Sequence, residues 1–160
     1  MKEKQNPETL LMEGQAVQFH PTGYSMYPFL NPDKGDQVIV EPLDKRKAKR
    51  GDVVLYRRGG EKGTVNEDGF EQGILVLHRI VKCSNGQYFM VGDNQSEVEG
   101  PLPEEQIKGI MTARLRNGRA LSAKNPFYRL AAGLWLLVLP GRSRLKDIAH
   151  AVKIRLIRKP

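Results

Sequence analysis

The chain has 160 residues, of which 39% are hydrophobic, with 16 Gly, 10 Pro and a single cysteine. This length and composition suit one turn-rich, mainly β domain, and they exclude a helical bundle and an internal disulfide framework. The net charge of +8 is uneven: residues 1–113 hold 14 Lys/Arg and 17 Asp/Glu, whereas residues 114–160 hold 12 Lys/Arg and one Asp. The sequence has no zinc-ligand spacing and no Gly-rich phosphate loop, so neither a metal nor a cofactor is predicted.

Apolar and β-branched runs predict a mainly β body that is preceded by one short helix over residues 7–13. The predicted strands cover Ala16–His20, Gln37–Glu41, Asp52–Tyr56, Ile74–Val81, Tyr88–Val91 and Lys108–Leu115. A tight hairpin turn is expected at Asn85-Gly86, and the polar, Gly-rich residues 59–73 are expected to form a loop or hairpin. We expect residues 1–125 to form the β domain and residues 126–160 to form a basic helical tail.

The segment from Gly23 to Pro28 presents Ser25 in a setting suited to nucleophilic attack. Gly23 allows a sharp backbone turn and a close approach by a substrate, and Pro28 discourages regular helix or central strand. Met26 lies between them and can pack inward to fix the loop. Taken alone, this pattern is more typical of an ordinary turn than of a catalytic serine.

Three further segments follow in order along the chain, at Lys49–Tyr56, Leu77–Val81 and Val91–Asn94. With the Ser25 segment, the series resembles the type I signal peptidases and the serine-peptidase superfamily that they share with LexA-like self-cleaving repressors. The four segments span roughly residues 17–110, and their order is far more specific than any one of them. The resemblance implies a coiled β-barrel-like catalytic fold, with Ser25 as nucleophile and the general base in the third segment.

His78 stands at the position of the general base in this resemblance. Bacterial signal peptidases and LexA-like proteins usually carry lysine there, so His78-Arg79-Ile80 is similar to the histidine-type enzymes and implies a Ser–His pair. Neutral imidazole is a good proton acceptor near pH 7, and serine needs such a base to become nucleophilic. An isolated histidine in a buried strand would instead be a core residue bonded to a carbonyl. Lys82 would share the strand face of His78 but misses the motif position.

Asp93, in the Gly-Asp-Asn segment, is the first candidate for the group that orients the imidazole, as the resemblance implies. Glu99 stands where histidine-type relatives place a second aspartate and is the alternative imidazole partner. Asp93 also suits a turn-capping role. The Ser25 backbone N–H is the natural first oxyanion donor, and the second donor is either Thr22, a backbone amide or absent.

The tail changes character after Asn125. An apolar helix is expected over Leu130–Leu139, too short to cross a bilayer, and a basic amphipathic helix is expected from Ser143 onward. Two interpretations stay open. Residues 130–159 either make peripheral contact with the cytoplasmic face of a membrane, or form a hairpin that packs on the body or on another subunit.

These features predict a serine endopeptidase that cleaves a leader peptide, a regulatory protein or itself through a Ser–His acyl-enzyme mechanism, assisted by Asp93. A self-cleaving LexA-like regulator is one alternative, although the first 16 residues are too short for a DNA-binding domain and no nucleic acid is expected as partner. A catalytically idle binding module, attached through its tail to a membrane or an anionic partner, is the other. Residues 1–20 contain no secretory signal or membrane span, so a cytoplasmic location is expected.

Overall fold

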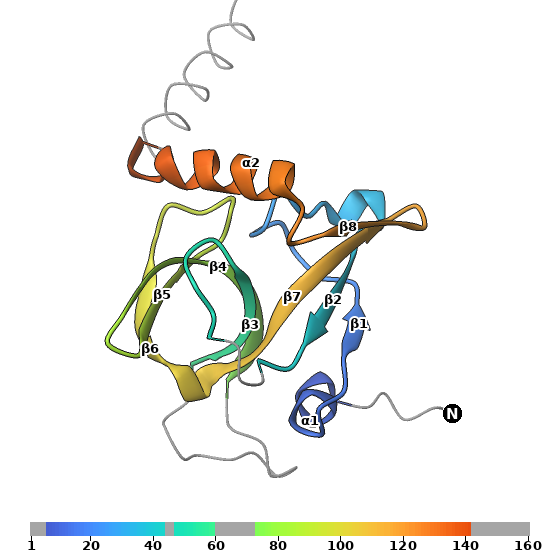
Figure 1. Ribbon diagram of the computed structural model, residues 1–160, viewed down its shortest axis with the longest axis horizontal. Coiled ribbons are helices and arrows are strands. Elements are labelled where there is room, and N and C mark those ends of the chain that lie inside the picture. Colours follow the sequence, from blue (N-terminus) through green and yellow to red (C-terminus); the bar gives the residue numbers. More distant parts are fainter. Residues whose placement is uncertain (1–5, 44–46, 60–72, 142–160) are drawn as a thin grey trace, which may run out of the picture.

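The body of the protein is a curled antiparallel sheet, seen in a computed structural model that describes residues 6–43, 47–59 and 73–141 (Figure 1). The described strands pair in the order β1-β2-β7-β3-β4-β5-β6, and β8 pairs with β7. Their bounds are β1 Val17–Phe19, β2 Gln37–Glu41, β3 Val53–Arg58, β4 Ile74–Ser84, β5 Gln87–Val91, β6 Glu99–Pro103, β7 Ile107–Arg116 and β8 Arg119–Ser122. Helix α1 covers Pro7–Met12 and α2 covers Pro126–Leu137, and 3-10 turns cover Pro32–Lys34, Glu104–Gln106 and Leu139–Gly141.

The structure confirms a mainly β body with a helix on each side of it in sequence. Each predicted strand is present within a few residues of its expected bounds, and Asn85 and Gly86 both have positive φ, as a type I′ hairpin turn requires. Sequence reasoning missed β6 and β8. Strand β6 carries Pro101 and Pro103, which argue against a strand, but it lies at the edge of the sheet, where a missing N–H is tolerated. The predicted loop over residues 59–73 lies almost entirely outside the described residues.

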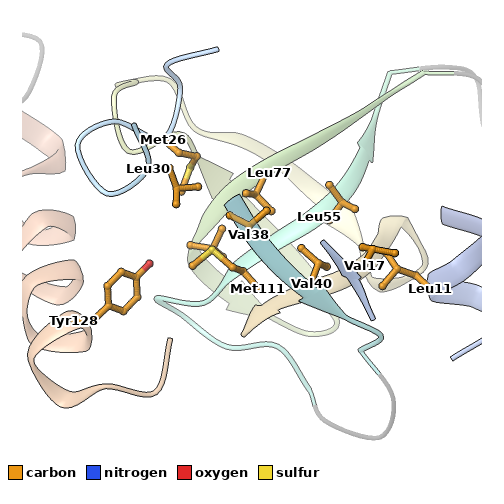
Figure 2. Close-up of a cluster of buried hydrophobic side chains, with 11 residues drawn as sticks. Leu11, Val17, Met26, Leu30, Val38, Val40, Leu55, Leu77, Met111 and Tyr128 are labelled. Atoms are coloured by element: carbon orange, nitrogen blue, oxygen red, sulfur yellow. The ribbon is translucent and has the colours of Figure 1, made fainter. Parts of the chain in front are cut away.

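Alternating side chains of β3 contribute to two separate hydrophobic clusters on the two faces of the sheet. Val54 and Tyr56 belong to the cluster that also draws on β4, β5 and β7. Val53 and Leu55 face the other way, into a cluster that both helices and the Ser25 loop complete (Figure 2). That second cluster comprises Leu11, Val17, Met26, Leu30, Val38, Val40, Val53, Leu55, Leu77, Met111 and Tyr128. The Ser25 loop is therefore fixed to the hydrophobic core.

Helix α2 lies across one end of the curled sheet and packs on it (Figure 1). It begins earlier than the sequence predicts, because the Asn125 side chain accepts hydrogen bonds from the N–H groups of Phe127 and Tyr128 and so caps a first turn. Tyr128, Ala132 and Leu136 are buried against the body. No helix in the described ranges has both the length and the apolar character needed to cross a bilayer. The basic helix expected from Ser143 onward lies outside the described residues.

Candidate active site

Ser25 lies in the loop between β1 and β2, at the wall of a cavity of about 370 Å³. Gly23 has φ +78°, a conformation that glycine adopts freely and that turns the chain just before the serine. Met26 is 4% exposed and packs into the core, as the sequence predicts. The side chain of Ser25 itself is half-buried. The loop is thus anchored on one side of the serine and open to the cavity on the other.

The turn after β5 holds the backbone of the Ser25 loop in place. The Asn94 N–H donates to the Ser25 carbonyl oxygen over 2.7 Å. A Cβ added at Gly92 would lie 2.7 Å from the same carbonyl oxygen and 2.6 Å from Gln95 Oε1, so only glycine permits this approach. The Gly-Asp-Asn segment therefore positions the proposed nucleophile through its backbone.

Replacing Gly92 with alanine is expected to lower the free energy of unfolding by about 1–3 kcal/mol, because the new methyl group must displace the Ser25 loop. Gly133, in the exposed part of α2, provides the matched control because a Cβ there meets nothing within 4 Å. Its replacement by alanine should raise stability by up to about 1 kcal/mol. Urea denaturation of both variants makes the comparison, and equal effects would show that Gly92 has no special packing role.

His78 is buried in β4, 1% exposed, beside Tyr56 of the neighbouring strand. Val54 pairs directly with His78 and Tyr56 with Val76, so Tyr56 and His78 share one face of the sheet. The Tyr56 hydroxyl lies 3.0 Å from His78 Nδ1 and donates to Glu99 Oε2 over 2.7 Å. Glu99 Oε1 lies 3.5 Å from the same Nδ1. A hydrogen-bonded chain therefore runs from the carboxylate through the phenol to the imidazole.

This chain determines which imidazole nitrogen carries the proton. A carboxylate only accepts, so the Tyr56 proton points to Glu99 and the phenol oxygen accepts from His78 Nδ1–H. In neutral His78 the other nitrogen, Nε2, then keeps its lone pair. Burial lowers the pKa of His78, and the charge of Glu99 partly opposes that effect. His78 is consequently a neutral imidazole at pH 7, with Nε2 ready to accept a proton.

The other two members of the chain are also held in the protonation states that this arrangement needs. Burial and the hydrogen bond to Glu99 raise the pKa of Tyr56 far above its ordinary value, so the phenol keeps its proton. Burial acts to raise the pKa of Glu99, but hydrogen bonds from Tyr56 and Arg58 outweigh it and the pKa lies below its ordinary value. Arg58 Nη1 donates to Glu99 Oε1 over 2.8 Å.

Ser25 and His78 line the same cavity, although no hydrogen bond joins them in the described structure. Serine–base hydrogen bonds are often long in enzymes without substrate and shorten when substrate is bound. Thr22 and Gly23 line the cavity as well. Within the described ranges the Ser25 N–H donates no hydrogen bond, so it is available as an oxyanion donor.

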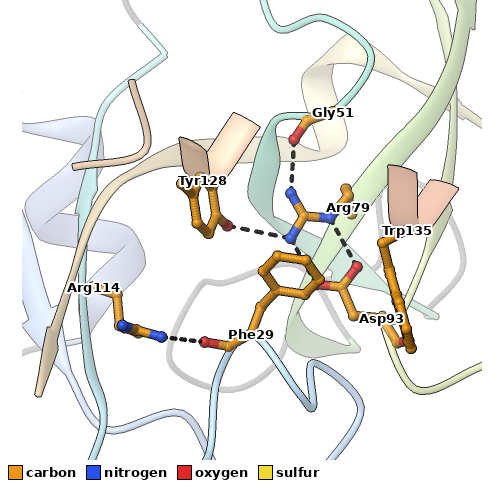
Figure 3. A network of polar contacts seen from close by, with 7 residues as sticks. All are labelled: Phe29, Gly51, Arg79, Asp93, Arg114, Tyr128 and Trp135. Atoms are coloured by element: carbon orange, nitrogen blue, oxygen red, sulfur yellow. Dashed lines mark hydrogen bonds and ion pairs between the residues drawn. The ribbon is translucent and has the colours of Figure 1, made fainter. Parts of the chain in front are cut away.

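Asp93 lies in a different network, beneath α2 (Figure 3). Its two carboxylate oxygens accept from Arg79 Nε over 2.8 Å and Nη2 over 2.7 Å, and both side chains are fully buried. Arg79 also donates to the Gly51 carbonyl and the Tyr128 hydroxyl. The Trp135 indole N–H donates to the Asp93 carbonyl oxygen. Asp93 acts on His78 through its charge, whereas Glu99 and Tyr56 are the groups at Nδ1.

The sequence reasoning thus named Ser25, His78, Asp93 and Glu99 but missed Tyr56 and Arg58. A signal was available for Tyr56: once β3 and β4 are paired in register, Tyr56 falls on the face of His78. Among the described residues no three His, Cys, Asp or Glu side chains gather as a metal site would require. Comparisons with protein-family models, curated proteins and solved structures gave no match to the chain.

Proposed function

We propose that this chain is a serine endopeptidase of the histidine type, in which Ser25 is the nucleophile and His78 the general base. The hydrogen-bonded chain Glu99–Tyr56–His78 is the observation that carries the proposal. The Tyr56 hydroxyl at Nδ1 fixes the tautomer of this buried histidine so that Nε2 carries the lone pair, and His78 lines the cavity that Ser25 also lines. The four-segment resemblance to signal peptidases and LexA-like proteins supports the same roles.

The reaction follows from these positions. His78 Nε2 takes the Ser25 hydroxyl proton as Oγ attacks the scissile carbonyl carbon, and the Ser25 N–H binds the oxyanion. Imidazolium then gives that proton to the leaving amine, the C–N bond breaks and an acyl-serine remains. A water molecule, deprotonated by His78, hydrolyses the ester and restores the serine. The Tyr56–Glu99 pair stabilises the transient positive charge at Nδ1.

The shape of the site suits an extended peptide substrate. Strand β5 pairs with β4 only from Arg79 onward, so no described strand pairs with that edge of β4 over residues 74–78. The same residues line the cavity, together with the end of β1, which is itself an edge strand. A peptide laid along these edges can form main-chain hydrogen bonds like an added strand. A peptide or protein substrate is the class that this surface favours.

A fluorophosphonate probe, which phosphonylates activated serines and loses fluoride, tests the proposal directly. The wild-type chain should be labelled at Ser25, as peptide mapping by mass spectrometry would show, because the paired base makes Oγ nucleophilic. Ser25→Ala should abolish the label, and Ser122→Ala, on β8 and away from the cavity, should leave it unchanged. Absence of labelling above the level of heat-denatured protein would identify a catalytically idle binding module instead.

The pH dependence of labelling is expected to move in opposite directions in two variants. Labelling requires neutral His78, so its rate should fall as the pH drops through the pKa of His78, which burial sets below the ordinary value. Glu99 raises that pKa and Arg58 lowers it. Glu99→Gln should therefore move the acidic limb to lower pH, and Arg58→Gln should move it to higher pH. Rate–pH profiles of the three proteins provide the measurement, and unshifted limbs would show that another group controls labelling.

A further inference from the structure

Helix α2 presents a second apolar face, opposite the one that packs on the body. Tyr128, Ala132 and Leu136 face inward. Large apolar side chains recur along the outer side at helical spacing, and each is well exposed: Phe127 80%, Leu130 62%, Leu134 56%, Leu137 68% and Val138 42%. Folded monomers rarely expose so continuous an apolar stripe unless it contacts a partner.

A basic pocket of about 360 Å³ lies beside the first turn of the same helix. Lys47, Lys49, Lys124 and Arg129 line it, against one acidic side chain, Asp52, which is paired with Arg129 over 3.2 Å. The three lysine side chains are exposed. The pocket has the size and charge to hold a phosphate-bearing headgroup while the neighbouring stripe meets apolar surface.

We propose that α2 docks this protein on an anionic lipid bilayer, with the outer stripe in the interfacial layer and the basic pocket against headgroup phosphates. Apolar side chains at the acyl boundary with flanking lysines at the headgroups are the combination that interfacial helices use. The charge of the surrounding described segment favours lipid over a second copy of this chain, because residues 114–141 hold five Lys/Arg and no Asp or Glu. Pairing two copies through this face would bring two such segments together, and like charges oppose that contact.

This docking surface is independent of the proposed chemistry, since none of its residues lines the Ser25 cavity. It nevertheless lies near the Ser25 loop in the fold. Phe29, four residues after Ser25, makes edge contacts with the rings of Tyr128 and Trp135 on the inner side of α2. Docking through the outer side would therefore hold the Ser25 loop close to the membrane surface.

Co-sedimentation of the 160-residue chain with vesicles tests the proposal. The wild type should sediment with vesicles of phosphatidylcholine and phosphatidylglycerol in equal parts and remain in solution with phosphatidylcholine alone. L130Q/L134Q/L137Q should lose this binding, whereas Met12→Gln, which removes an exposed apolar side chain from α1, should keep it. Ser25→Ala should bind as the wild type does, which separates this test from that of the peptidase.

The pocket requires a charge-matched comparison. K47Q/K124Q should weaken binding to the anionic vesicles about tenfold, and K34Q/R119Q, which removes two exposed charges elsewhere, should weaken it much less. Equal loss in the two double variants would overturn the pocket's role. Undiminished binding by the triple glutamine variant would overturn the docking surface. Dimerisation in sedimentation velocity that the triple variant abolishes would also overturn it, because a second copy would then cover the stripe.

Discussion

On the proposed mechanism, replacing His78 with alanine is expected to lower the rate of peptide cleavage about 10⁴-fold or more, because Ser25 loses the base that takes its proton. The substrate for this measurement is a peptide that mass spectrometry finds cleaved when a peptide library is incubated with the wild-type chain. Single-turnover kinetics then give the rate of the chemical step. Ser25→Ala should reduce the rate at least as far, and the two replacements together should add little, since both groups act in one step.

Lys82 is the matched control for His78. It lies on the same strand, it is basic, and its side chain is exposed beside the Phe89 ring. Lys82→Ala should cleave the peptide at nearly the wild-type rate. If Lys82→Ala lost activity and His78→Ala kept it, the base would be a lysine and the histidine assignment would be wrong. Thermal unfolding of each variant confirms that the losses are losses of chemistry.

Breaking the Arg79–Asp93 pair is expected to have the largest effect on stability. Both side chains are fully buried, so Asp93→Asn leaves a guanidinium without its counter-charge and Arg79→Met leaves a carboxylate without one. Each single replacement should lower the free energy of unfolding by about 3–5 kcal/mol. Urea denaturation at pH 7 measures these changes.

The double variant R79M/D93L is the decisive control for this pair. Removing both charges leaves no unpaired ion in the core, so it should recover much of the stability that either single variant loses. Arg79 lies over the Phe29 ring at 4.8 Å, and methionine retains part of that packing. Strictly additive losses would show that the two side chains contribute separately, through packing alone.

The strands of the sheet could be predicted from the sequence because the side chains of a strand point alternately to its two faces, which gives buried strands a recognisable pattern of apolar residues. Val53 to Tyr56 alternate between two clusters, and the predicted strand Ile74–Val81 begins where β4 begins and ends three residues before its last residue, Ser84. The exceptions have local causes. Strand β6 escaped notice because its prolines suit only an edge, and the start of α2 escaped notice because a cap, rather than apolar periodicity, extends the helix back to Pro126.

The candidate site was only partly readable for a different reason. Ser25 and His78 could be named from local motifs, but the partners of His78 depend on strand pairing across long separations. Glu99 approaches the imidazole because β6 pairs with β5, with Glu99 opposite Met90. Asp93 was expected beside the imidazole, yet its carboxylate bonds Arg79, one residue along β4 on the opposite face. Neighbouring residues of a strand point to opposite faces of the sheet, so the sequence alone does not show which of His78 and Arg79 faces Asp93 until the strand register is known.

The inner side of α2 also carries an intrinsic fluorescent probe of the Ser25 loop. Trp135 is the single tryptophan of the chain, and its indole donates to the carbonyl of Asp93, the residue before the amide that binds the Ser25 carbonyl. All tryptophan fluorescence of the protein therefore comes from Trp135, which is linked to Ser25 through two hydrogen bonds to the backbone, one at Asp93 and one at Asn94. A bound peptide or inhibitor that displaces the Ser25 loop should therefore change the fluorescence emission of the unlabelled protein.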